Sequence, residues 1–292
     1  MNHHQCIEVT MWGRVTDSHW KHVRRTMYDL PFLFFPGSNK QPTFCSFLFK
    51  LPSFYPKHHF KLSTMSQRFW DANKELISIT EKHPFLISMV HGTLEEEKFK
   101  YYVIQDALYL TDYSACLRLL GDLCPDENDS KRLYEFAVGA EETEKALHKS
   151  FFQKWNIHSE GVEQMPHSLL YTSYLLRIVS TRPFAEGLAA VLPCFWVYMH
   201  VGKCLLKLRE DLGDSVTRAE PFDEWIDLYA SEEFEKEVLD YKAIVDKAVE
   251  TADDETLTLM QEHFTMCCKL EHMFWDQAND LMTWPSSLEV GK

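Results

Sequence analysis

The sequence predicts an all-α fold, a single helical bundle over residues 65–285 that follows an irregular N-terminal extension. From about residue 66 onward, apolar residues recur at intervals of three and four, which is the period of an amphipathic helix. No segment shows the alternation of apolar and polar residues, bounded by turn residues, that is typical of a half-buried strand. Glycine is scarce, at 10 of 292 residues, which disfavours turn-rich β architectures, and the apolar content of 45% is enough for a core.

The N-terminal extension, residues 1–64, differs from the rest of the chain in charge and composition. It contains three acidic residues against eight lysines and arginines, whereas the whole chain has a net charge of −14. Five prolines interrupt it, and its apolar clusters are too short for a secretory signal. We therefore expect a disordered or presequence-like extension, with Met65 as a sensible second start. The expected location is the cytoplasm, and an organellar presequence within residues 1–64 is the alternative.

The first helices of the domain are predicted from breakers and caps. The apolar pattern over residues 66–80 predicts one helix, after which Pro84 opens a short helix that Gly92 stops. Thr93 and Glu96 have the spacing of a capping box and predict the start of a long helix.

The later helices are predicted in the same way. They are expected to begin at Asp126, Pro166, Pro183, Pro221, Ser231, and Asp253 or Asp254. The helix from Asp126 should end at Trp155, and the last two should end near Thr251 and Met282. Residues 286–292 are expected to form a C-terminal tail.

Charge and motif content disfavour several classes of function. A net charge of −14 disfavours binding to nucleic acid or to an anionic membrane surface, so neither is expected as a partner. The eight cysteines form no C-x-x-C motif, which disfavours a zinc ribbon or a thioredoxin-type site. No Glu-x-x-His occurs, which weakens the case for a di-iron bundle. We expect neither a metal nor a cofactor.

A proline, a cysteine and a tyrosine mark one apolar helix as a candidate site. Pro193 removes a backbone N–H and crowds the carbonyl four residues earlier, so the helix is expected to bend or loosen there. Cys194 follows directly, and Tyr198 lies one turn later on the same face. The thiol is a candidate nucleophile. The alternative is a buried cysteine that only packs, which is the usual role of a free cysteine.

Two carboxylates lie in apolar surroundings along the chain. Asp106 stands in the middle of a predicted apolar stripe, where a carboxylate must be paired or hydrogen-bonded, and Tyr109 shares its face. Glu271 is followed by Phe274 and Trp275 at i+3 and i+4, whose rings would desolvate it and raise its pKa, as suits a general acid. The alternative for both residues is a solvated position on a helix.

Four spaced motifs occur in order along the chain. They are Gln105-Asp106-x-x-Tyr109, Leu192-Pro193-Cys194-x-Trp196-x-Tyr198 followed by Gly202, Phe222-x-x-Trp225-Ile226-x-x-Tyr229 with Phe234, and Glu271-x-x-Phe274-Trp275. Together they resemble the thiaminase II (TenA) family, in its cysteine-bearing branch. Each motif is weak alone, and their order and spacing make the resemblance specific. It implies a haem-oxygenase-like helical fold, a homotetramer and one pyrimidine pocket per subunit. It also implies hydrolysis of thiamine, or of 4-amino-5-aminomethyl-2-methylpyrimidine, to hydroxymethyl pyrimidine in thiamine salvage.

The resemblance also implies a role for each matched residue. Cys194 would add to C6 of the pyrimidine ring, Glu271 would protonate a ring nitrogen, and Asp106 would hold the exocyclic amine. The remaining substrate-binding residues would be Tyr109, Tyr171, Tyr198, Phe274 and Phe222, the last standing where many members have tyrosine.

Two other functions fit parts of the same pattern. A non-catalytic pyrimidine-binding or regulatory protein would need Asp106 and the stacking aromatic rings, but it would not need a thiol. A metal- or haem-dependent oxidase on the same fold would need bound iron. The sequence does not distinguish thiamine from its breakdown product as substrate.

Overall fold

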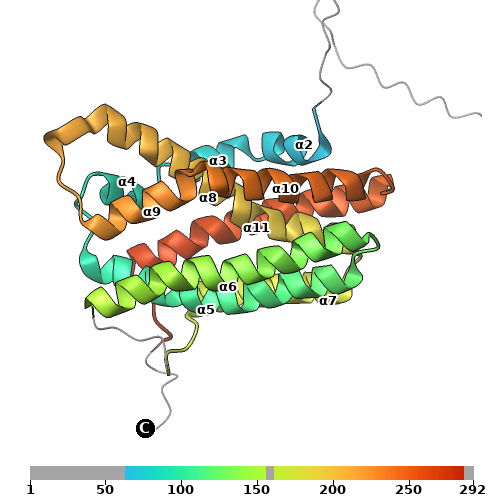
Figure 1. Ribbon diagram of the computed structural model, residues 1–292, viewed down its shortest axis with the longest axis horizontal. Coiled ribbons are helices and arrows are strands. Elements are labelled where there is room, and N and C mark those ends of the chain that lie inside the picture. The colour runs from blue at the N-terminus through green and yellow to red at the C-terminus, as the bar shows by residue number, and fades with distance from the viewer. Residues whose placement is uncertain (1–62, 156–160, 286–292) are drawn as a thin grey trace, which may run out of the picture. The chain divides into compact units, whose positions relative to one another are not determined.

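The computed structural model describes residues 63–155 and 161–285, and these residues form a bundle of α-helices with no strand (Figure 1). Its helices are α2 (Met65–Ala72), α3 (Lys74–Thr80), α4 (Pro84–Val90), α5 (Glu96–Leu123), α6 (Glu127–Trp155), α7 (Pro166–Thr181), α8 (Phe184–Leu212), α9 (Glu220–Ala230), α10 (Glu232–Val249) and α11 (Asp254–Asn279), with a short 3₁₀ turn, η1 (Gly213–Ser215), after α8. The predicted all-α class is confirmed. The expected tail and all but the last two residues of the expected extension lie outside the described residues.

The predicted caps of the last two helices are confirmed. The Ser231 hydroxyl accepts a hydrogen bond from the backbone N–H of Phe234 at 3.1 Å, and α10 begins one residue after Ser231. Asp253 accepts from the backbone N–H of Thr256 at 2.8 Å, at the start of α11. Each cap satisfies an amide that the first turn of a helix leaves without a partner.

The helix predicted over residues 66–80 is interrupted at Asn73, which separates α2 from α3. The side-chain amide of Asn73 donates to the carbonyl of Phe69 at 2.8 Å, while its backbone N–H donates to Trp70 at 2.9 Å. Such local bonds from an asparagine compete with regular helical bonding. The apolar period continues through this break, and for that reason the sequence pattern did not show it.

The capping box predicted at Thr93 and Glu96 is wrong. Helix α5 begins at Glu96 itself, after Glu95, and no side chain caps it. The hydroxyl and the backbone N–H of Thr93 both donate to the carbonyl of Ser88, at 3.4 and 2.9 Å. Thr93 therefore completes the end of α4 rather than the start of α5.

Helix α8 is the central helix of the bundle and packs against α7, α9, α10 and α11. It runs as one α-helix through Pro193, so the proline does not interrupt it. By length and composition alone this segment could cross a membrane, but 72% of its apolar window is buried inside the protein. It is therefore a core helix, and its buried residues hold the bundle together.

Two glycines allow the chain to approach other segments closely. Gly92, the predicted stop of α4, has φ +65°, and a Cβ there would lie 2.1 Å from the carbonyl oxygen of Thr217. Gly202 on α8 faces α9, where an added Cβ would lie 2.6 Å from the carbonyl carbon of Tyr229. Only glycine lets α9 pack this closely on α8.

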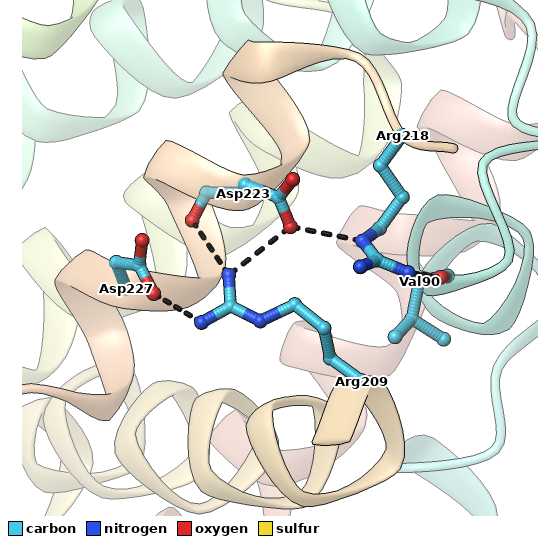
Figure 2. A network of polar contacts seen from close by, with 5 residues as sticks. All are labelled: Val90, Arg209, Arg218, Asp223 and Asp227. Carbon is cyan, nitrogen blue, oxygen red and sulfur yellow. Dashed lines mark hydrogen bonds and ion pairs between the residues drawn. The ribbon is translucent and has the colours of Figure 1, made fainter. Parts of the chain in front are cut away.

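An ion-pair network fixes α9 to the end of α8 and to α4 (Figure 2). Arg209 on α8 binds both Asp223, at 3.1 Å, and Asp227 on α9. Arg218 binds Asp223 at 2.9 Å and donates to the carbonyl of Val90 at 3.1 Å. An isolated surface ion pair contributes little to stability, but residues that share partners in a network are held in one geometry. The network thus orients α9, whose other face reaches the pocket described next.

Candidate active site

Cys194 and Tyr198 line a pocket whose remaining walls come from α5, α6, α9 and α10. The pocket contains about 560 Å³ of space, its solvent-open mouth included, and most of its lining is apolar. Asp106 projects into it from α5 and is buried, with 4% of its surface exposed. A mainly apolar cavity with a few polar groups is the usual form of a small-molecule site.

The thiol of Cys194 lies beside Tyr113 of α5. The Tyr113 hydroxyl donates to the carbonyl of Val191 at 3.3 Å and is also within hydrogen-bond reach of the Cys194 sulfur. Burial raises the pKa of Tyr113 well above its usual value, and the neighbouring Cys194 raises it further. The hydroxyl therefore keeps its proton, which it can donate to a thiolate in place of the Val191 carbonyl.

Glu271 of α11 is buried, with 1% of its surface exposed, and is not among the residues that line the pocket. Burial raises the pKa of its carboxyl group to about 8, and the charge of Asp106 adds to this, while a hydrogen bond from Tyr171 opposes it. That bond runs from the Tyr171 hydroxyl to Oε1 of Glu271 at 2.6 Å. Phe274 and Trp275 are also buried, in agreement with the aromatic surroundings expected from the sequence. Glu271 is thus a protonated carboxylic acid at neutral pH.

A tyrosine joins the thiol side of the site to the carboxyl side. The ring of Tyr109 stacks on Tyr113 at 5.6 Å and contacts Tyr171 at 5.0 Å and Phe274 at 5.6 Å. Its hydroxyl is buried and has no hydrogen-bond partner among the described residues. A buried hydroxyl without a partner costs about 1–3 kcal/mol, so it is a natural contact for a bound ligand.

Tyr198 is held by Tyr102 and Tyr229, which were not predicted as site residues from the sequence. The Tyr102 hydroxyl donates to the Tyr198 hydroxyl at 3.5 Å and accepts from the indole N–H of Trp225 at 3.1 Å. The Tyr198 ring also packs against Tyr229 at 4.9 Å. These contacts fix the phenol on the pocket wall.

Phe222, a predicted substrate contact, is absent from the pocket lining, and its role stays a prediction. It is buried and packs edge-on against Phe99 at 5.0 Å. Phe99 in turn packs against Tyr102 at 5.9 Å. Phe222 therefore packs behind the pocket wall. The position of its helix, α9, depends on tertiary contacts that no local sequence pattern encodes.

Two further pocket residues were missed from the sequence. Tyr113 lies four residues after Tyr109 and seven after Asp106, so its helical spacing could have placed it on the same face. Glu237 of α10 lines the pocket, and burial raises the pKa of its carboxyl group. No motif marked Glu237, because α10 meets the pocket only through tertiary packing.

Known proteins share this architecture and much of this sequence. The sequence model of the TENA/THI-4/PQQC family matches residues 68–281. The chain belongs to this family. An aminopyrimidine aminohydrolase of Bacillus subtilis is 33% identical to it, over 70% of this chain and 85% of that protein. A protein of the same name from Halalkalibacterium halodurans is also 33% identical, over 75% of this chain and 94% of that one.

Solved structures of the TenA family and of related folds agree with the helical arrangement. A TenA homologue from P. horikoshii has a TM-score of 0.67 at 22% identity, and the match covers 74% of this chain and 99% of that one. A domain with a heme oxygenase-like fold from Shewanella denitrificans has a TM-score of 0.57 at 14% identity, covering 73% of this chain and 90% of that one. The expected haem-oxygenase-like fold is confirmed.

The pocket of this TenA-family chain brings together groups suited to substitution chemistry on a flat ring. A thiol on α8, a carboxylate on α5 and a neutral carboxyl group on α11 come from helices far apart in the sequence. Of the predicted site residues, Asp106, Cys194 and Tyr198 line the pocket. Tyr109 packs on the lining residue Tyr113, and Tyr171, Phe274 and Glu271 follow Tyr109 through ring and hydrogen-bond contacts.

Proposed function

We propose that the chain is an aminopyrimidine aminohydrolase (thiaminase II) of thiamine salvage. Its substrate would be thiamine or 4-amino-5-aminomethyl-2-methylpyrimidine, and its product hydroxymethyl pyrimidine. The observation that carries the proposal is a thiol in the pocket lining, Cys194, beside a chain of contacting tyrosines that leads to a buried carboxyl group, Glu271. Burial raises the pKa of Glu271 to about 8, which keeps it protonated at neutral pH. The names of the Bacillus subtilis and Halalkalibacterium halodurans relatives support the same activity.

The pocket offers what a neutral aminopyrimidine needs for binding. Such a ring is flat and has hydrogen-bonding nitrogen atoms along one edge, so aromatic walls and a few polar groups suffice. Asp106 can accept from the exocyclic amine. Tyr109 has an unused buried hydroxyl that a ring substituent can satisfy.

Cys194 and Glu271 would then divide the chemistry between them. The Cys194 sulfur forms a bond to C6, and its proton passes to the departing amine, or to solvent where the leaving group is the thiazole ring of thiamine. Glu271 gives its proton to the ring nitrogen. The electron pair gained by the ring expels the nitrogen substituent from the exocyclic methylene, which breaks the C–N bond. Water adds to that carbon and loses a proton, the S–C6 bond breaks, and the sulfur and Glu271 regain their protons. Nucleophile and acid act in the same step, which lowers its barrier.

Incubation of the purified full chain with each pyrimidine substrate tests this function. Release of hydroxymethyl pyrimidine, followed by chromatography and mass spectrometry, is the expected result for at least one of them. The ratio of the two kcat/KM values identifies the better substrate. Tight binding of hydroxymethyl pyrimidine without turnover of either substrate would instead support the non-catalytic binding protein.

A further inference from the structure

Three side chains outside the pocket converge on one point between α3 and α8. Glu81 follows the last residue of α3, and His200 and Cys204 are one turn apart on α8. The distances are 2.8 Å from His200 Nε2 to Glu81 Oε2, 3.6 Å from Cys204 Sγ to His200 Nε2, and 3.7 Å from Cys204 Sγ to Glu81 Oε2. Each residue thus presents one potential ligand atom to the other two.

We propose that this cluster, the α3–α8 site, binds a divalent transition-metal ion of the zinc type. Bonds of about 2.0–2.3 Å in tetrahedral geometry place neighbouring ligand atoms about 3.3–3.7 Å apart. Both distances to the sulfur match this spacing, and the shorter His200–Glu81 distance is that of a hydrogen bond, which an ion would replace. Only a shift of a few tenths of an ångström would be needed.

A nucleophilic relay explains the same arrangement less well. In a Cys–His–carboxylate relay the thiol and the carboxylate bind opposite nitrogens of the imidazole ring. Here Nε2 of His200 faces both Glu81 and Cys204. A single nitrogen between a carboxylate and a thiol is the arrangement of ligands around an ion.

The donor set decides the class of ion. A thiolate, an imidazole and a carboxylate suit zinc or cobalt, whereas magnesium and calcium prefer oxygen ligands alone. The Cys204 thiol would lose its proton to solvent as the ion binds, and the charges of thiolate and carboxylate would then balance a divalent cation. His200 and Glu81 are half-buried, with 32% and 23% of their side chains exposed, so an ion and a water ligand can reach the site. The ring of His200 is also held, edge-on to Trp70 at 5.1 Å.

In a second cluster of possible ligands, His83, His272 and Asp276, the Nε2 atom of His83 is not available to a metal ion. His83 Nδ1 accepts a hydrogen bond from the backbone N–H of Phe85 at 3.1 Å. Its Nε2 must therefore carry the proton that it donates to Asp276 at 3.0 Å. That nitrogen has no lone pair for a metal, so this cluster serves as a control.

Cobalt titration of the full chain, first stripped of metal with a chelator, tests the α3–α8 site. We expect one Co²⁺ per chain at this site, with visible bands of tetrahedral cobalt and near-ultraviolet thiolate-to-cobalt absorption. Cys204→Ser should remove the thiolate absorption. Cys204→Ser and His200→Ala should each weaken cobalt binding by about 100-fold or more. Changing a residue that only supports a metal ligand already costs about 10–100-fold in affinity, and loss of a ligand should cost at least as much. Glu81→Gln, which keeps size and hydrogen bonding, should weaken binding in the same direction.

Matched variants separate this site from another thiol and another histidine. Cys124→Ser alters another half-buried cysteine, and His272→Gln alters the second cluster. Both should keep the wild-type cobalt spectrum, and circular dichroism should show that every variant is folded. A Cys204→Ser protein that is folded and keeps the wild-type spectrum and affinity would overturn the proposal. So would a wild-type protein that binds no cobalt at micromolar concentration.

Discussion

At the scale of single residues, the proposed reaction depends on the protonation of Glu271. Burial raises the pKa of this carboxyl group to about 8 from an ordinary value of 4.5. Below pH 8 it is a neutral acid, and above pH 8 it loses the proton that the ring nitrogen needs. We predict that kcat/KM falls as the pH rises through about 8, which a pH–rate profile of the free enzyme would show.

Variants at the neighbours of Glu271 sharpen this prediction. The hydrogen bond from Tyr171 lowers the pKa of Glu271, and the charge of Asp106 raises it. Tyr171→Phe should therefore move the falling limb to higher pH, and Asp106→Asn should move it to lower pH. Glu271→Gln should remove the limb and lower turnover by roughly 10²–10⁴-fold, as for loss of a general acid. A falling limb that persists in Glu271→Gln would show that another group titrates near pH 8.

Glu271 also links stability to pH. Between about pH 4.5 and 8 the folded protein keeps a proton on this group that the unfolded chain has lost, so the free energy of unfolding falls as the pH rises through that window. Glu271→Gln removes this dependence. We predict that the variant becomes more stable relative to wild type as the pH is raised from 5 to 8, by an amount on the order of a few kcal/mol. Thermal melts of both proteins at several pH values would measure it, and parallel curves would contradict it.

The site residues that could be predicted from the sequence are those whose neighbours along the chain form a recognisable pattern. Cys194 follows a proline in an apolar helix, and Glu271 precedes two aromatic residues at helical spacing. Tyr102 supports Tyr198 across two helices, and no spacing along the chain records such a contact. The position of Phe222 likewise depends on how α9 packs against α8 and α5, which no local pattern records.

At the scale of helices, the contact between α8 and α9 depends on one glycine. A side chain at position 202 would collide with the backbone at Tyr229, which lines the pocket. We predict that Gly202→Ala pushes α9 outward, destabilises the protein by about 1–3 kcal/mol and lowers turnover. Gly139→Ala is a matched control for stability, because a Cβ there would meet its nearest neighbour only at 3.9 Å, but not for turnover, because Gly139 lines the pocket. A Gly202→Ala protein with wild-type melting temperature and activity would contradict the predicted contact.

Helix order followed from the sequence better than helix ends did. Ser231 and Asp253 act through bonds to amides three residues away, so a local pattern was enough to predict them. Asn73 and Thr93 instead use their polar groups on carbonyls of the preceding helix. The same residue types can cap the helix that follows or end the one before, and tertiary packing decides which.

At the scale of the whole molecule, we predict that residues 1–64 are dispensable for folding and activity. The matched family region begins at residue 68, and the charge balance changes sign near residue 64. A chain beginning at Met65 should be soluble and should keep the melting temperature and kcat/KM of the full chain. Inactivity of this shorter chain, beside an active full chain, would place part of residues 1–64 in the domain.

We also predict that the protein is a homotetramer. Leu169 and Leu170 stand next to each other on α7 with 42% and 49% of their surface exposed, and such exposed apolar residues are suited to contacts between subunits. Light scattering at micromolar concentration should give four times the mass of one chain, 34.4 kDa. A monomeric mass would contradict this prediction.

The central claim is that the Cys194 thiol is the nucleophile, and turnover by Cys194→Ser tests it most directly. Serine keeps the size of the side chain but replaces the thiol with an alcohol, which is far less acidic and is a weak nucleophile unless a base activates it. With thiamine and with the aminomethyl pyrimidine, kcat should fall on the order of 10³-fold or more, equivalent to about 4 kcal/mol of barrier. Binding of hydroxymethyl pyrimidine should change little, because Asp106 and the aromatic walls hold the ring. A folded Cys194→Ser enzyme with near wild-type kcat on either substrate would contradict the account.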